Sequence, residues 1–494
     1  LHSTSRRQRQ MCIRDRKKLR AILTVEDKVI FDGCCDTEPC KPVTLNFNPT
    51  QGMYKIVLYD ESGRCLLEYA EEKLDEMHYP EPLTLDPHPA KIKTVQELYL
   101  QGMHKDQYRN PQIEPDVYYK EALRREPDHI PSLIALGEYK YRRGYFQEAR
   151  VLLEKAIKNE HIYNLRYPDG EAEYLLGLVL DALGETDKAY DVLYASAWSG
   201  YTASKAMCKL AAIDGRRKDF ANMLAHATTA LEYASRHPLA SAYAALAKWK
   251  LGDKEGALSL IDHALHFDPL NDLAAYVRLI LLDKSVAELE QMRRSDMGQI
   301  ALDVAYDLAD GGFVQEAYQL LQGISDKTTP MVAYTAAYLM CRMGHQDDEL
   351  RNAALNCPIK TAYPYRLAEM KVLMEMVADP HDAMARNLLA CLLYDKGHFE
   401  RAGQLWEEAC AIESNHAAYV RNLAIAYFSH LNRKEDALQL LIKAMEIAPD
   451  NDQIKLEYLY AATKMGTDGK ERLRVIQQHP LAGKPSDDYV LEHA

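Results

Sequence analysis

The sequence has no apolar run that approaches the roughly 18 residues that a helix needs to cross a membrane. Its first twenty residues also lack the apolar stretch of roughly 7–15 residues that marks a secretory signal. Both absences argue against a membrane partner and against export. We therefore expect a cytoplasmic chain.

Acidic side chains outnumber basic ones outside the N-terminal head. The whole chain has 60 Lys and Arg against 73 Asp and Glu, and a formal net charge of −13. The first twenty residues hold eight of the basic side chains and one Asp, so that 52 basic and 72 acidic side chains remain in the rest. A body with this charge repels a phosphate backbone. We expect it to have no nucleic-acid partner.

Cysteine is present, but not in metal-binding patterns. None of the 10 cysteines forms a CxxC pair, and no histidine lies at zinc-finger spacing from one. The densest stretch is CCDTEPC (34–40), where two adjacent cysteines cannot both turn toward one metal without a special turn. We favour loop thiols in a reducing cytoplasm over a metal site here.

Catalytic sequence motifs are missing as well. The chain contains no GxSxG, HExxH, phosphate-binding loop or dinucleotide-binding glycine pattern. Its many carboxylates are typical of solvated helix faces rather than of a paired acid and base. We therefore predict no catalytic residues, no cofactor and no metal, and hence no enzyme activity for this chain by itself.

What the chain does contain is an internal repeat. Residues 130–157, IPSLIALGEYKYRRGYFQEARVLLEKAI, place the small residues Gly137, Ala149 and Ala156 where two helices would pack closely, with Gly144 at the turn between them. This pattern resembles the tetratricopeptide repeat (TPR), which has small residues at positions eight, twenty and twenty-seven and a turn glycine near fifteen.

The same register returns along the chain. Position eight falls at Gly137, Gly177, Ala211, Ala245, Ala305, Ala337, Ala390 and Ala424. Turn glycines follow at Gly144, Gly184, Gly252, Gly312, Gly344 and Gly397. Two irregular gaps, at 245–305 and 337–390, hold further helical segments that we interpret as degenerate repeats. The resemblance implies a mainly α fold, a TPR-type α-solenoid of antiparallel helix pairs that contact neighbouring repeats.

The N-terminal piece has a different period. AILTVEDKVIFDG, KPVTLNFNP and YKIVLYDESGRCLLEYA alternate apolar and polar residues, and DESGR is typical of a hairpin turn. We expect a small N-terminal β-strand remnant of three or four strands. The predicted organisation is a β-rich remnant at 17–78, a Pro-rich linker at 79–96, a solenoid of about eight regular and two degenerate repeats at 97–465, and a truncated segment at 466–494.

A closer resemblance is carried by residues 97–127, 167–178, 195–214 and 237–272, which include ASAWSGYTASKAMCKLAAID and HPLASAYAALAKWKLGDKEGAL. These stretches resemble the C-terminal half of large bacterial proteins of the domain-of-unknown-function 5107 (DUF5107) family. That resemblance implies a β-rich, mutarotase-like region of a carbohydrate-active parent ahead of the repeats. Residues 17–78 would be its last strands.

The basic head has two interpretations. SRRQRQMCIRDR (5–16) resembles a translated sequencing adapter, as found at the ends of metagenomic fragments, and we expect residues 1–16 to be a disordered artefact. The alternative is an arm that binds acidic partners.

The remaining candidate site is the concave groove. In tetratricopeptide repeats, the first helix presents positions five, nine, twelve and thirteen to this groove. The candidate binding residues that we select from these positions are Tyr141, Arg142, Tyr174, Trp249, Lys250 and Tyr394. Such side chains suit capture of a peptide or partner helix, although several could instead pack between repeats. A second candidate is a polar cluster of His104, Tyr108 and Arg109, with helix capping as the alternative.

Two classes of function follow. The first is a non-catalytic interaction scaffold that binds a protein partner, a second copy or its own β-rich half. The second is a fragment of a carbohydrate-active protein, mutarotase-like or glycoside hydrolase-like, whose catalytic region lies upstream.

Overall fold

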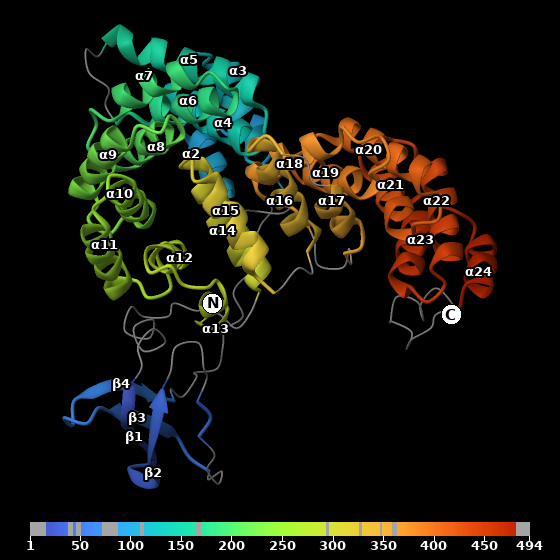
Figure 1. The fold of residues 1–494 in the computed structure, drawn as a ribbon. Coiled ribbons are helices and arrows are strands. Elements are labelled where there is room, and N and C mark those ends of the chain that lie inside the picture. Colours follow the sequence, from blue (N-terminus) through green and yellow to red (C-terminus); the bar gives the residue numbers. More distant parts are fainter. Residues whose placement is uncertain are drawn as a thin grey trace. The chain divides into compact units, whose positions relative to one another are not determined.

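The computed structural model describes residues 16–37, 43–45, 51–71, 87–108, 113–163, 169–292, 296–325, 329–345, 348–357 and 363–480. The chain divides into a sheet unit that ends at Pro87 and a helical unit that begins at His88 (Figure 1). Residues 1–15 of the head and Arg109 lie outside the described residues, so the predictions made for them stay predictions.

The sheet unit is a four-stranded antiparallel sheet. Its strands are β1 (Arg16–Val25), β2 (Lys28–Thr37), β3 (Tyr54–Tyr59) and β4 (Cys65–Ala70), in the order β2-β1-β3-β4. Alternate residues of β1 are buried, from Leu19 to Val25, as expected for a strand with one covered face. The predicted DESGR turn is confirmed, because Asp60 accepts hydrogen bonds from the backbone of Ser62 and Arg64. The predicted strand at 41–49 lies largely outside the described residues, and residues 43–45 are not in a strand.

The helical unit opens with a 3₁₀ turn (Pro89–Lys91). The helices that follow are α2 (Val95–Gln107), α3 (Asp116–Arg125), α4 (Ile130–Arg142), α5 (Phe146–Tyr163), α6 (Glu171–Ala182), α7 (Thr186–Ser196), α8 (Ala203–Arg216), α9 (Phe220–Tyr233), α10 (Pro238–Lys250), α11 (Lys254–Phe267), α12 (Asp272–Leu281) and α13 (Ala287–Met292). They continue as α14 (Met297–Asp310), α15 (Val314–Gly323), α16 (Pro330–Arg342), α17 (Asp348–Leu355), α18 (Leu367–Met376), α19 (Ala383–Asp395), α20 (Phe399–Ile412), α21 (Ala417–Ser429), α22 (Lys434–Ile447), α23 (Asp452–Lys464) and α24 (Gly469–Gln478). Helical structure thus starts before residue 97 and continues beyond 465.

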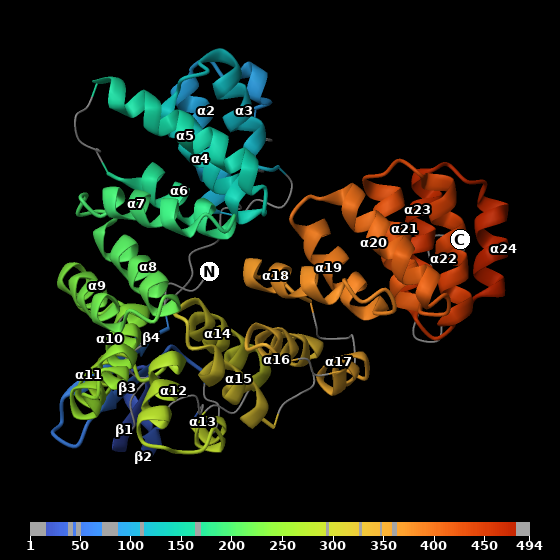
Figure 2. The same cartoon turned by 45° about the horizontal axis from the view of Figure 1, so that its top comes forward.

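Consecutive helices pair antiparallel, as Figure 2 shows for α19 with α20 and α21 with α22. Small residues form the seams between the paired helices. A Cβ atom on Gly137 of α4 would stand 2.8 Å from Cγ of Leu153, and one on Gly177 of α6 would stand 2.6 Å from Cγ of Leu193. Ala257 of α11 is fully buried. The chain is therefore a TPR-type α-solenoid of antiparallel helix pairs, with a small N-terminal sheet.

The turns inside the pairs use left-handed backbone. The predicted turn glycines have φ of 77° at Gly144, 82° at Gly184, 92° at Gly252, 85° at Gly312, 86° at Gly344 and 90° at Gly397. In the register that starts from Ala211, the same place is taken by Lys218 with φ of 61°. Side chains other than glycine are strained in this region, which is why the sequence marks most of these turns with glycine.

Contacts are not confined to neighbouring repeats, so that expectation is wrong, as two contacts among the described residues show. At the first, the C-terminal end of α8 meets that of α14, where a Cβ on Gly215 would stand 2.2 Å from the carbonyl oxygen of Gly311. At the second, the turn after α4 meets the turn after α19. There Tyr145 donates to the carbonyl of Gly397 at 2.9 Å, and its ring stacks on His398. Glycines without side chains allow these backbones to approach.

Candidate binding pocket

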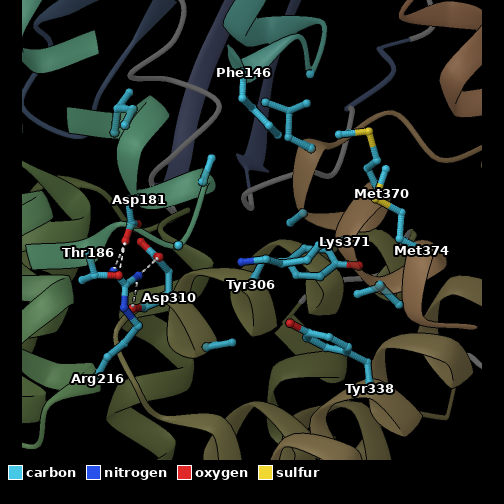
Figure 3. A pocket seen from close by; sticks show the side chains of 18 of the residues that line it. Phe146, Asp181, Thr186, Arg216, Tyr306, Asp310, Tyr338, Met370, Lys371 and Met374 are labelled. Atoms are coloured by element: carbon cyan, nitrogen blue, oxygen red, sulfur yellow. Dashed lines mark hydrogen bonds and ion pairs between the residues drawn. The ribbon is translucent and has the colours of Figure 1, made fainter. Parts of the chain in front are cut away.

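A pocket of about 690 Å³ lies between the helices α4–α8 and α14–α18 (Figure 3). Most of its lining comes from the ends of the first helices of repeats, α4, α6, α8, α14 and α16, and from one side of α18. Its polar and aromatic lining residues are Tyr141, Phe146, Asp181, Thr186, Lys209, Arg216, Tyr306, Asp310, Tyr338, Arg342 and Lys371.

Four of these side chains form a closed ion-pair network. Lys209 lies 3.1 Å from Asp181 and 2.8 Å from Asp310, and Arg216 lies 2.6 Å from each of the same two carboxylates. Each cation thus bridges helix α6 to helix α14. Within this network two positive charges balance two negative charges.

The network holds Lys209 and Asp310 in the charged form. Burial disfavours the charged form of Lys209, but Asp310 and Asp181 outweigh that effect and raise its pKa above the ordinary value. Burial would likewise raise the pKa of Asp310, but Lys209 and Arg216 hold it below its usual value. For nearby Asp307, burial raises the pKa to about 6, with smaller contributions from Asp310 and Asp303. The four paired groups join helix α6 to helices α8 and α14.

The rest of the lining is aromatic, apolar and cationic. Burial raises the pKa of Tyr141 and of Tyr306, and Tyr306 shares a hydrogen bond of 2.7 Å with Thr335. Figure 3 shows Tyr338, Met370 and Met374 on the side opposite Asp181 and Arg216.

Arg342 and Lys371 are the exposed cations of this pocket. Both line it, and neither forms an ion pair with any residue that the structure describes. Besides the ion-pair network, the lining therefore carries two further positive charges beside aromatic rings, in an otherwise acidic chain.

The described lining includes no histidine, cysteine or serine, and both of its carboxylates are held by two cations each. The arrangement suits binding: an anionic ligand would meet Arg342 and Lys371, and an apolar group would meet the tyrosines and methionines.

The predicted groove residues do not form one surface. Tyr141 lines the pocket, whereas Arg142 pairs with Asp106 and lines a second pocket nearer the N-terminal end of the array. Tyr174 is half-buried, with Lys205 4.5 Å from its ring centre, and burial raises its pKa to about 12.

The remaining predicted residues lie in neither of these two pockets. Trp249 is half-buried against the main core, and Lys250 lies 2.8 Å from Glu316. Tyr394 packs among Phe399, Trp406 and His430. Of the polar cluster, His104 and Tyr108 have ring centres 4.6 Å apart at the end of α2.

The sequence-based predictions missed most of the residues that line the pocket, although the repeat register indicates four of them. Positions nine and thirteen of the register at 305 are Tyr306 and Asp310, and those of the register at 337 are Tyr338 and Arg342. These four residues therefore occupy groove-facing positions, and the repeat register predicts them once it is extended to every repeat. Lys371 could not be found in this way, because α18 follows no regular register.

Comparisons with solved structures return TPR proteins, at low similarity. The MamA protein is 19% identical over 35% of this chain and 91% of its own, with a TM-score of 0.30. YrrB, a TPR protein with an unusual peptide-binding site, is 18% identical over 37% of this chain and 89% of its own, with a TM-score of 0.30. The C-terminal part of a TPR protein from Cytophaga hutchinsonii is 9% identical over 67% of this chain and 98% of its own, with a TM-score of 0.32. The fold assignment rests on the helix pairs described above.

No family model matches the chain, so the DUF5107 resemblance stays a prediction. The described residues hold no group of three or more His, Cys, Asp or Glu side chains placed to bind a metal. Within the same ranges, no helix is both long and apolar enough to cross a bilayer.

Proposed function

We propose that the chain is a non-catalytic interaction scaffold, and that the pocket between α4–α8 and α14–α18 captures an acidic segment of a partner protein. The observation that carries this proposal is that Arg342 and Lys371, which form no ion pair with a described residue, line one cavity together with the rings of Tyr306 and Tyr338. A segment with a carboxylate beside an aromatic or aliphatic side chain matches both halves of that lining.

The charge of the rest of the molecule favours a selective encounter. A net charge of −13 repels acidic segments in general, so that such a segment is attracted only where positive charge is concentrated. Desolvated aromatic anchors then supply most of the affinity. Nucleic acid is disfavoured as the ligand, because the repulsion by the acidic body acts on a long phosphate backbone.

The test uses short random peptides displayed on phage and selected on the full chain. We expect the selected peptides to combine Asp or Glu with an aromatic or aliphatic residue. The double variant Arg342→Gln/Lys371→Gln should weaken their binding at least about tenfold, measured by fluorescence anisotropy. The matched control is Arg401→Gln/Lys434→Gln, which removes two charges from helices that do not line the pocket. Equal binding by both double variants would refute the proposal.

A second candidate is that the helical unit serves a larger β-rich, carbohydrate-active protein of the DUF5107 type. The supporting observation is the sheet itself, because β2 and β4 are edge strands with one neighbour each among the described strands. In this proposal the basic head is an adapter-derived artefact, the parent is a cytoplasmic bacterial protein, and the ligand of the pocket is intramolecular. A longer genomic read tests it: several hundred β-rich residues in frame before Lys17 would support it, and their absence would refute it.

A further inference from the structure

A second pocket, of about 640 Å³, lies along the groove face of α4 and has the opposite charge. Its lining comes from α2, α3, α4, the end of α5, the start of α6 and the turn before α8. The acidic lining residues are Asp106, Glu138, Glu160, Asp169 and Glu171, and Arg142 is the cation among the lining residues.

Most of these carboxylates have partners. Asp106 pairs with Arg142, whereas Glu138 lies 3.6 Å from that same guanidinium. Asp169 accepts a hydrogen bond of 3.0 Å from the backbone of Glu171, and Glu171 lies 3.9 Å from Lys205. Arg142 and Lys205 thus supply two positive charges against five carboxylates, and the pocket has a surplus of negative charge.

Glu160 differs from the other carboxylates of this lining. It is 6% exposed and lines the pocket, and it forms no hydrogen bond or ion pair with any residue in the described ranges. Burial, with a smaller contribution from Asp169, raises its pKa to about 7. A buried carboxylate that faces a cavity without a cation is costly, unless a ligand supplies the charge.

Tyrosines complete the lining. Tyr99 and Tyr119 are packed in a tilted pair with ring centres 6.3 Å apart, and Tyr201 at the rim is 68% exposed. Aromatic faces next to carboxylates fit a planar guanidinium, which can stack on a ring while its N–H groups donate to oxygen. A divalent metal fits less well, because no three of the described carboxylates are gathered to hold one.

We propose that this second pocket takes an arginine side chain of a partner protein, held by Glu160 and Glu138 and covered by Tyr201. The proposal is independent of the acidic-segment site, because the two pockets share no lining residue. It also gives the groove two subsites of opposite charge, one on each side of the α4 end that carries Tyr141 and Arg142.

The test measures fluorescence anisotropy of a labelled peptide of alternating glycine and arginine, at physiological salt. Against the full chain, we expect Glu160→Gln to weaken binding at least about tenfold, and Tyr201→Ala to weaken it several-fold. The matched control, Glu435→Gln on α22, removes one exposed negative charge and should leave binding within about twofold. Arg342→Gln/Lys371→Gln should leave it unweakened, which separates this site from the first one.

A folding measurement keeps the result interpretable. Glu160→Gln removes an unpaired buried charge, so its melting temperature above pH 7 should equal or exceed that of the parent while its binding falls. The proposal is overturned if Glu160→Gln and Glu435→Gln bind the arginine peptide alike. It is also overturned if a peptide with glutamine in place of arginine binds as well.

Discussion

At the scale of single residues, two buried carboxylates stand out, because neither accepts a hydrogen bond among the described residues. Glu173 on α6 is 1% exposed, and neither of its carboxylate oxygens has such a donor. Nε2 of His161 lies 4.0 Å from one of these oxygens. Burial raises the pKa of Glu173 to about 7, the same value as for Glu160. Both groups oppose folding once they are charged.

The first prediction follows from the sign of that shift. The pKa of Glu173 is about 7 in the folded chain against an ordinary value of 4.5, so the folded state binds the proton more tightly. The resulting stabilisation is complete below pH 4.5 and is lost as the pH rises through 7. We therefore compare the unfolding free energy of Glu173→Gln with that of the parent at each pH. This difference should favour the variant by roughly 3 kcal/mol more above pH 7 than below pH 4.5. Urea denaturation at several pH values measures this gain.

The exposed substitution Glu435→Gln is the control, because it changes the net charge equally without burial. If Glu173→Gln shows the same dependence on pH as this control, the buried carboxylate is not the cause.

At the scale of elements, the turns between paired helices are alike in backbone and different in surroundings. Gly252 and Gly312 occupy the same register position, with φ of 92° and 85°. A Cβ on Gly252 would meet open space, whereas one on Gly312 would stand 2.5 Å from the carbonyl oxygen of Gly215 on α8. The sequence predicts a turn at both glycines, but Gly312 also lies at the contact between α8 and α14.

The second prediction compares alanine at these two turns. Gly252→Ala should cost about 1 kcal/mol of unfolding free energy, because the strain is confined to the left-handed backbone. Gly312→Ala should cost roughly 2–4 kcal/mol, because it also forces α8 and α14 apart. Denaturation midpoints of the two variants check the difference. Equal losses would mean that the α8–α14 contact does not form.

At the scale of the helical unit, distant repeats are joined by a contact that the repeat pattern does not contain. The ring centres of Tyr145 and His398 lie 3.9 Å apart, and Nε2 of His398 lies 2.8 Å from the carbonyl oxygen of Arg143. Arg143 in turn donates to the carbonyl of Asp395 at 3.3 Å. This contact joins the turn after α4 to the turn after α19, beside the pocket residue Gly144.

The third prediction concerns His398→Ala, which removes the ring stack and the bond to Arg143. It should speed hydrogen exchange both around residue 398 and around residues 143–145, and cost about 1–2 kcal/mol of unfolding free energy. His345→Ala is the matched control, because His345 holds the same register position in the turn after α16 but is exposed. Faster exchange near residue 398 alone would show that the two turns do not touch.

The sequence by itself determined the repeats, their turns and their seams, since these depend on short-range requirements. A left-handed turn needs glycine at Gly144 and Gly184, and a close helix pair needs a small residue at Gly137 or Gly177. The tertiary structure alone decided which groove positions meet. Tyr141 and Tyr306 belong to repeats far apart in the chain, and they share a cavity because α8 and α14 touch, whereas Trp249 at an equivalent position packs against the core. Spacing along the chain determines which face a side chain occupies, but the curvature accumulated over many helices determines what lies opposite that face.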